Sequence, residues 1–245
     1  MTVTLDFTGK RVLVVGGSSG IGNAIARNFF ACGAQVHVWG TRAQASDYAG
    51  QDGSDLTGLH YAQVDMANPA SLEAYTLPFD SLDILVLSQG IALYQRAEFQ
   101  MPGFREVMEI NLMSVMACAM RFHDMLAAAK GSLIIISSCA ALEATKGNPA
   151  YNASKTGAFG LTRTLGQAWA PEGIRVNGIA PGFVATKLTK ATTDHPHRLK
   201  AATDRIPLGR LGTPDEMAGV ALFLASPLSS YVVGQTLLVD GGMLL

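Results

Sequence analysis

Residues 15–22 read Val15-Gly16-Gly17-Ser18-Ser19-Gly20-Ile21-Gly22 and join a short apolar run at 11–15 to a helical pattern at 20–32. The glycines at positions 16, 20 and 22 allow the backbone to come close to a pyrophosphate, and the helix start supplies free N–H groups and positive dipole. The other interpretation is an ordinary glycine-rich turn between a strand and a helix. Because the stretch follows the first strand of an alternating α/β chain, we expect it to bind a dinucleotide.

Around this stretch, short β-branched runs alternate with longer helical patterns. The runs lie at 11–15, 35–39, 59–64, 82–87, 132–137, 175–180 and 236–239, and the helical patterns at 20–32, 101–129, 150–171 and 214–226. The runs are continuously apolar, as strands covered on both faces are. No internal repeat or long linker divides the chain. The pattern predicts a single α/β domain over residues 1–245, a Rossmann-type, doubly wound, seven-stranded parallel sheet with helices on both faces.

The composition excludes several classes of protein. With 49% apolar and 15% charged residues, the 245-residue chain can bury a large core, which excludes disorder. The net charge of −1, without a basic run, argues against nucleic acid and anionic membranes as partners. Cys32, Cys118 and Cys139 lack a CxxC spacing, so neither a disulfide framework nor a zinc site is expected. No signal peptide or membrane span is predicted, and we expect a cytoplasmic protein.

The end of the second strand bears on which dinucleotide is bound. An acid about 20 residues after the glycine loop usually binds the adenosine ribose, but no acid occurs between Asp6 and Asp47. Thr41 and Arg42 stand there instead. A guanidinium matches phosphate oxygens, and the missing carboxylate removes repulsion against a 2′-phosphate. This favours NADP(H) over NAD(H), although Arg42 could also be a plain solvated loop residue.

Three residues form a candidate catalytic group. Tyr151 and Lys155 are four residues apart in a helical pattern and therefore share a face of the helix. Ser138 follows a strongly apolar strand, so its hydroxyl is expected at the carboxyl end of the sheet, where ligands bind in such folds.

These motifs resemble the short-chain dehydrogenase/reductase family almost from end to end. The glycines at 16, 20 and 22 match its cofactor loop, Asp65 its adenine contact, Asn111, Ser138, Tyr151 and Lys155 its catalytic tetrad, Pro181-Gly182 with Thr186 its nicotinamide loop, and Asp240-Gly241-Gly242 its C-terminal signature. The implied cofactor contacts are Gly16, Ser18, Ser19, Gly20, Ile21, Gly22, Thr41, Arg42, Asp65, Gly90, Tyr151, Lys155, Pro181, Gly182, Val184 and Thr186.

The chain departs from the family pattern in three places. Leu87-Ser88-Gln89-Gly90 replaces the common Asn-Asn-Ala-Gly, and Val15 replaces a threonine. Both positions are mainly structural in the family. The interval from Asp65 to Asp83 is short, which implies a trimmed helix and is similar to the sugar- and small-carbonyl-reductase branch.

The resemblance implies oxidoreduction between a secondary alcohol and a ketone, with Tyr151 as the general acid/base. An ammonium about 4 Å away, at an effective dielectric of about 20, gives about 4 kcal/mol, so Lys155 is expected to lower the pKa of Tyr151 by roughly three units before desolvation erodes the gain. By resemblance, Lys155 also binds the nicotinamide ribose and Ser138 orients the substrate oxygen. Asn111 anchors a water-linked proton path through its backbone carbonyl; otherwise it is a polar residue that bends a helix.

The polar segment 186–210 is expected to be a mobile lid over the substrate, since the family places its variable substrate loop there. We expect no metal at His195 and His197, because companion ligands are missing. Cys139 has no histidine to activate it and is expected to be a packing residue.

Two alternatives to a general carbonyl reductase remain open. One is a 3-oxoacyl-carrier-protein reductase, with Arg175 or Lys187 on the phosphopantetheine arm. The other is a dinucleotide-binding sensor without catalysis on the same fold. By family resemblance we also expect a homotetramer, with the apolar tail Met243-Leu244-Leu245 buried at an interface.

Overall fold

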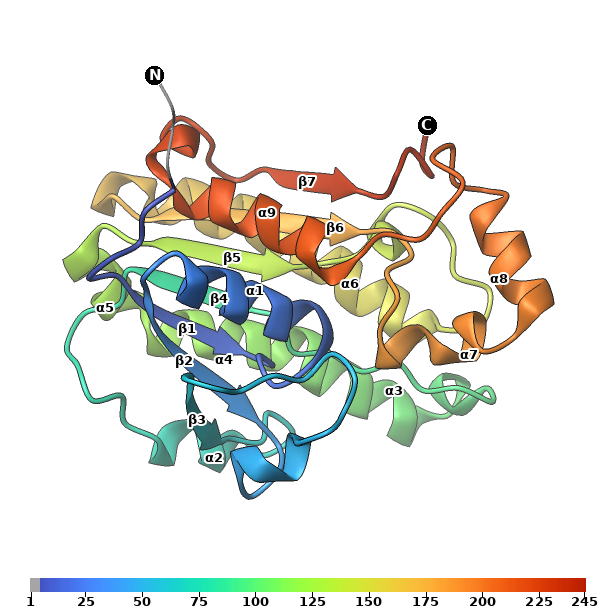
Figure 1. The fold of residues 1–245 in the computed structure, drawn as a ribbon, viewed down its shortest axis with the longest axis horizontal. Coiled ribbons are helices and arrows are strands. Elements are labelled where there is room, and N and C mark those ends of the chain that lie inside the picture. The colour runs from blue at the N-terminus through green and yellow to red at the C-terminus, as the bar shows by residue number, and fades with distance from the viewer. Residues whose placement is uncertain (1–4) are drawn as a thin grey trace.

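The computed structural model describes residues 5–245, and its centre is one parallel sheet in the order β3-β2-β1-β4-β5-β6-β7 (Figure 1). The strands are β1 (Arg11–Val15), β2 (Gln35–Gly40), β3 (His60–Gln63), β4 (Ile84–Leu87), β5 (Ser132–Ile136), β6 (Arg175–Pro181) and β7 (Thr236–Val239). All six neighbouring pairs are parallel. The predicted Rossmann-type, seven-stranded parallel sheet is therefore confirmed.

Helices cover both faces of the sheet because successive strand residues point to opposite sides. On β1, Leu13 and Val15 belong to a core shared with α4 (Ser114–Arg121) and α6 (Pro149–Trp169). Val12 and Val14 belong to a second core with α1 (Gly20–Ala31) and α9 (Pro214–Ala225). Figure 1 shows α1 and α9 in front of the sheet and α4 and α6 behind it.

The helical pattern at 101–129 is not one helix, which corrects the expectation. It divides into α3 (Met101–Met108), the π-helical turn η3 (Glu109–Met113), α4 and α5 (His123–Ala129). The chain bends by 52° at Phe122, whose ring is buried in the core between α4 and α5. By length and composition alone, residues 101–121 and 123–129 together could cross a membrane as a bent pair. No single helix within residues 5–245 is long and apolar enough to do so.

The remaining helices are short. They are α2 (Pro69–Ala74), which confirms the trimmed helix, α7 (Lys190–Thr193) and α8 (Pro196–Thr203), together with the 3-10 turns η1 (Ala45–Tyr48), η2 (Ala97–Phe99), η4 (Cys139–Ala141), η5 (Ala170–Glu172), η6 (Lys187–Thr189) and η7 (Pro227–Ser229). In Figure 1, α7 and α8 lie beyond the arrowheads of the strands. They therefore stand at the carboxyl edge of the sheet, where ligands bind in such folds.

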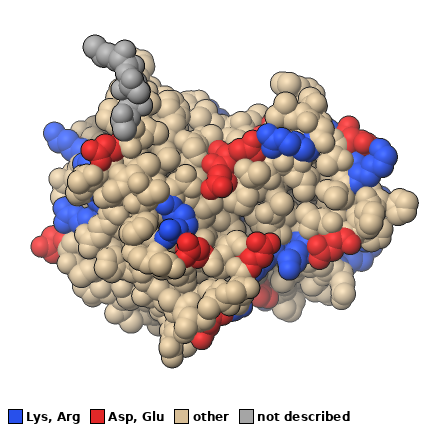
Figure 2. Space-filling model, viewed as in Figure 1, with Lys and Arg blue, Asp and Glu red and all other residues tan. Residues whose placement is uncertain are grey.

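Acidic and basic side chains are interspersed on the face drawn in Figure 2, and neither sign forms an extended patch there. This distribution agrees with the formal net charge of −1. Broad uncharged areas separate the charged groups on this face.

Candidate active site

A cleft runs along the carboxyl ends of the strands, across the point where strand order reverses between β1 and β4. All but two of the predicted catalytic and cofactor-binding residues line it: Gly16, Ser18, Ser19, Gly20, Ile21, Gly22, Thr41, Asp65, Gly90, Ser138, Tyr151, Lys155, Pro181, Gly182, Val184 and Thr186. The two that do not line it are Arg42 and Asn111. Residues far apart in the sequence thus meet in a single cleft.

The glycine loop leaves room for a bound anion at the start of α1. A Cβ at Gly20 would project toward Thr186, 3.5 Å from its methyl carbon, and φ at Gly20 is +57°. The first turn of α1 holds no acidic residue, and Ser19 makes no side-chain cap, so the helix start keeps its positive end for a ligand. The loop therefore fits the diphosphate of a dinucleotide.

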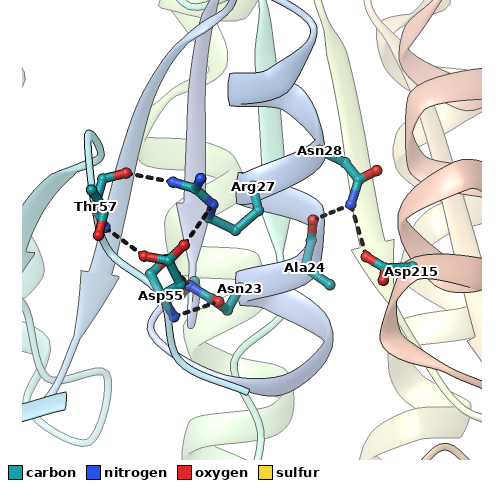
Figure 3. Close-up of polar contacts among 8 residues, drawn as sticks. Asn23, Ala24, Arg27, Asn28, Asp55, Thr57 and Asp215 are labelled. Atoms are coloured by element: carbon teal, nitrogen blue, oxygen red, sulfur yellow. Dashed lines mark hydrogen bonds and ion pairs between the residues drawn. The ribbon is translucent and has the colours of Figure 1, made fainter. Parts of the chain in front are cut away.

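The loop after η1 is tied against the first turns of α1 (Figure 3). The Asn23 amide donates to the Asp55 carbonyl at 2.9 Å, and its carbonyl oxygen accepts from the Asp55 backbone N–H at 2.9 Å. Arg27 pairs with the Asp55 carboxylate at 3.2 Å. The Gly20 N–H donates to the Gly53 carbonyl at 2.8 Å. This loop consequently forms one wall beside the glycine loop.

The structure places Arg42 beside the cleft rather than in it. Its guanidinium lies 4.6 Å from the centre of the Tyr48 ring and donates to the Asp47 carbonyl. The Tyr48 hydroxyl accepts from the backbone N–H groups of Thr41 and Arg42 at 3.2 Å each. Thr41 itself lines the cleft and is exposed. The turn after β2 is thus held by a tyrosine that sequence reasoning did not single out.

Ser138, Tyr151 and Lys155 meet where β5 and α6 lie side by side. The Ser137 hydroxyl donates to the Lys155 carbonyl at 2.9 Å and so joins the end of β5 to α6. The Lys155 ammonium donates to the Ile136 carbonyl at 2.9 Å. Ser138 caps the turn η4 by accepting from the Ala140 N–H at 3.1 Å. These contacts fix Ser138 and Lys155 at one end of the cleft, which Tyr151 also lines.

Burial dominates the protonation of Tyr151 and Lys155. It raises the pKa of Tyr151 above its ordinary value, against the lowering effect of the Ser138 hydroxyl, while Tyr94 and Glu98 raise it further. Burial also lowers the pKa of Lys155 to about 8. The Lys155 nitrogen lies 5.7 Å from the centre of the Tyr151 ring. The net direction for the pKa of Tyr151 is thus upward rather than the expected lowering, because burial is the largest cause.

Asn111 lies in the π-helical turn η3 and is fully buried. Its amide oxygen accepts from the Ile91 N–H and its nitrogen donates to the Ile91 carbonyl, both at 2.8 Å. The nitrogen also reaches the Ser154 hydroxyl on α6 at 3.2 Å. Asn111 thus links the segment after β4 to α6.

One hydrogen bond gives Gln89, which departs from the family pattern at 87–90, a structural role. The Gln89 amide donates to the Ser114 hydroxyl at 3.0 Å and joins the end of β4 to α4.

Sequence reasoning missed Glu98, Asn148 and Tyr94 near the catalytic group. Glu98 is buried and accepts from the Tyr151 backbone N–H at 2.9 Å. Asn148 precedes α6 and donates to Glu98 at 2.9 Å. No periodicity marks these residues, because their function depends on how the loop between β4 and α3 crosses α6.

The 186–210 segment contacts the rest of the molecule at several places, and three of these contacts reach separate parts of the chain. Lys187 donates to the Gln51 side chain beside the glycine loop. The Tyr94 hydroxyl donates to the Leu188 carbonyl. Arg205 pairs with Glu143, which follows the turn after β5, at 2.6 Å. The segment therefore lines the cleft at residues 186–189 and is joined to three separate parts of the chain.

Two further expectations are resolved by position. Arg175 lies at the amino end of β6, opposite the cleft, where it donates to the Leu224 carbonyl near the end of α9 and to the Ser229 hydroxyl of η7. It cannot reach a substrate arm in the cleft, so that expectation is wrong, whereas Lys187 does line the cleft. Cys139 is buried, and burial raises the pKa of its thiol to about 12, in keeping with a packing role.

Comparison with known proteins finds reductases that are similar to this chain over nearly its whole length. The family model described as enoyl-(acyl carrier protein) reductase matches residues 15–244. The chain is 38% identical over 247 residues to the 3-oxoacyl-[acyl-carrier-protein] reductase FabG of Chlamydia muridarum, covering 96% of this chain and 97% of that protein.

Two solved structures are also similar. The Pseudomonas aeruginosa RhlG/NADP active-site complex has a TM-score of 0.89 and 31% identity, covering all of both chains. The gluconate 5-dehydrogenase of Burkholderia cenocepacia, solved with NADP and tartrate, has a TM-score of 0.86 and 30% identity over 98% of this chain and 96% of that one. Fold, cleft and sequence agree: the chain belongs to the short-chain dehydrogenase/reductase family.

Proposed function

We propose that the protein is an NADP(H)-dependent oxidoreductase that interconverts a secondary alcohol and a ketone. The observation that carries this proposal is that Ser138, Tyr151 and Lys155 line the same cleft as the glycine loop. A binding sensor needs only the glycine loop, so Tyr151 together with the buried Lys155 favours an enzyme.

The proposed reaction needs a hydride on carbon and a proton on oxygen, and bound NADPH supplies the hydride. Tyr151 donates the proton to the substrate oxygen, because its raised pKa keeps the phenol protonated near neutral pH. Ser138 donates a hydrogen bond to the same oxygen and orients it. Lys155, with a pKa of about 8, carries a positive charge in most molecules at pH 7 and holds the cofactor ribose. Asn111 holds the backbone at Ile91 in place relative to Ser154 on α6.

The cofactor proposal has three supports. The loop at α1 holds no acid, the exposed turn at Thr41 and Arg42 holds none either, and the two solved relatives described above carry NADP. Asp65, which lines the cleft after β3, is the proposed contact for adenine.

The substrate is proposed by class from the relatives' names: a keto sugar acid or a 3-oxoacyl thioester. The test is a panel of 5-ketogluconate, a keto sugar and acetoacetyl-coenzyme A, followed by loss of NADPH absorbance. Turnover of one member that disappears in Tyr151→Phe is the expected result. NADPH binding without turnover of any member would favour the sensor instead.

Three further features belong to this proposal. The 186–210 segment is a lid that opens for substrate, the assembly is a homotetramer, and the enzyme works in the cytoplasm. The three contacts of the segment across the cleft support the first. Exposed apolar side chains on α3, on α4 and at the C-terminus support the second. The third is proposed by analogy with the bacterial reductases that this chain resembles.

A further inference from the structure

Glu98 is a buried residue, with only 1% of its surface exposed, and its carboxylate accepts hydrogen bonds from three donors. One oxygen accepts from the Leu93 N–H and from the Asn148 side-chain amide, and the other accepts from the Tyr151 N–H, all at 2.9 Å. Within residues 5–245 no arginine, lysine or histidine pairs with it. Burying an unpaired carboxylate is costly, so these three bonds are what hold the charge in place.

The carboxylate serves as the cap of α6 from another part of the chain. Asn148 occupies the N-cap position but makes no cap bond with its side chain, which donates to Glu98 instead. Pro149 has no N–H, and Tyr151 presents its N–H to Glu98. A negative charge at this end of the helix is also favoured by the helix dipole. The first turn of α6, which carries the catalytic tyrosine, is therefore fastened to Glu98.

The same carboxylate fastens the segment that faces the cleft from the other side. Glu98 holds Leu93, the Leu93 carbonyl accepts from Asn148 at 2.8 Å, and the next residue, Tyr94, reaches the 186–210 segment. Gln95 and Arg96 take positive φ angles of 57° and 64°, so the backbone turns sharply between Tyr94 and Glu98. One side chain thus joins the tyrosine helix to the segment that contacts the proposed lid.

We propose that Glu98 is a positioning residue for Tyr151, which sets the place of the phenol and its electrostatic surroundings. This inference rests on the proposed function, because it assigns Glu98 a role in the proton transfer by Tyr151. Glu98 does not touch the substrate; it acts through the backbone of Tyr151 and through its charge.

Because Glu98 is charged, its role can be tested through the pH dependence of the rate, which a merely structural residue would not change. The negative charge of Glu98 contributes to raising the pKa of Tyr151, after burial, the larger cause. Ketone reduction needs the protonated phenol, so the rate declines as pH rises through that pKa. Removing the charge lowers the pKa, and the decline then begins at lower pH.

The experiment compares Glu98→Gln, Glu98→Asp and the control Glu73→Gln, an exposed acid on α2, in the full-length enzyme. Glu98→Gln is expected to lower kcat by about tenfold to a hundredfold, the cost of a small misplacement of a catalytic group, and to move the alkaline decline to lower pH. Its Kd for NADPH, measured by fluorescence titration, stays within about twofold of wild type, because the glycine loop is untouched. Glu98→Asp keeps the charge but has a shorter reach, so it lowers kcat without moving the alkaline decline. Glu73→Gln behaves as wild type.

A second variant covers the case in which Glu98→Gln does not fold. Asn148→Ala removes one of the three donors and leaves the charge and the helix, and it is expected to lower kcat by about threefold to tenfold. Wild-type kcat in Asn148→Ala, or wild-type kcat and pH profile in Glu98→Gln, overturns the role of Glu98. Turnover that survives in Tyr151→Phe overturns the proposed function itself and is read independently of Glu98.

Discussion

Tyr151 and Lys155 lie four residues apart on α6, yet replacing each is expected to change turnover and cofactor affinity differently. Tyr151→Phe removes only the transferable proton, so turnover is lost and the affinity for NADPH stays near wild type. Lys155→Ala removes the buried amine that is proposed to hold the cofactor ribose, so turnover and affinity both fall. Steady-state kinetics and NADPH titration measure the two effects separately. A loss smaller than about tenfold in Tyr151→Phe contradicts the acid/base role.

Arg42 is the residue on which cofactor choice is expected to depend. Its guanidinium now rests on Tyr48, at the rim of the cleft, and can turn toward a 2′-phosphate. If it grips the phosphate, Arg42→Ala weakens NADPH about 10- to 150-fold and leaves NADH nearly unchanged. The measurement is kcat/KM for both cofactors at one ionic strength. A wild-type preference for NADH of about tenfold or more would overturn the assignment.

A substitution designed to reverse the preference from NADPH to NADH belongs at Thr41 rather than at Gly40. A Cβ at Gly40 would lie 2.7 Å from the Tyr48 hydroxyl and 2.8 Å from Ser18, so no acid fits there. Thr41 is exposed and lines the cleft. Thr41→Asp is expected to raise kcat/KM for NADH relative to NADPH, because a carboxylate accepts from the ribose and repels the phosphate.

At the scale of the elements, the β2–β3 edge of the sheet is expected to lose stability in mild acid. His37 on β2 is buried and stacks on His60 of β3 with ring centres 4.5 Å apart. Burial, and then the charge of His60, lower the pKa of His37 to about 4. The unfolded chain takes up this proton near the ordinary pKa of 6.5, so the stabilisation is complete above about pH 6.5 and is lost as the pH falls toward 4.

Urea unfolding at pH 7.5 and pH 5 checks this prediction. His37 is expected to contribute about 2 kcal/mol of the loss between the two values. His37→Gln reduces that loss, while the exposed His197→Gln does not. Equal losses in wild type and His37→Gln would contradict the assignment.

The elements also show what a sequence can and cannot predict. All seven strands were foreseeable, because most of them are apolar runs set between helical patterns, although β3 reads HYAQ and is half polar. The glycine loop and the Tyr151–Lys155 pair are local patterns in the chain. The bend at Phe122 and the positive φ angles at Gln95 and Arg96 follow from packing in three dimensions. Glu98 was missed for this reason: a carboxylate reads as a surface residue until the loop that buries it is known.

The whole molecule is expected to assemble as a homotetramer. Met113 at the end of η3 and Met120 on α4 are each 55% exposed, and Leu245 at the C-terminus is fully exposed, which leaves apolar surface in water. Burying these faces between subunits with two-fold symmetry would remove it. Light scattering at micromolar concentration should give four times the 25.8 kDa chain mass. Met113→Lys combined with Met120→Glu should lower it, and a wild-type mass of one chain would contradict the assembly.

The three contacts that hold the 186–210 segment across the cleft have a kinetic consequence. If this segment must detach before the oxidised cofactor leaves, and detaches more slowly than hydride is transferred, its detachment sets kcat. Deuterated NADPH should then give an isotope effect on kcat near unity. Tyr94→Phe, which removes the hydroxyl bonded to Leu188, should speed detachment and make the isotope effect visible. A full isotope effect on the wild-type kcat would place the slow step at the transferred hydrogen instead.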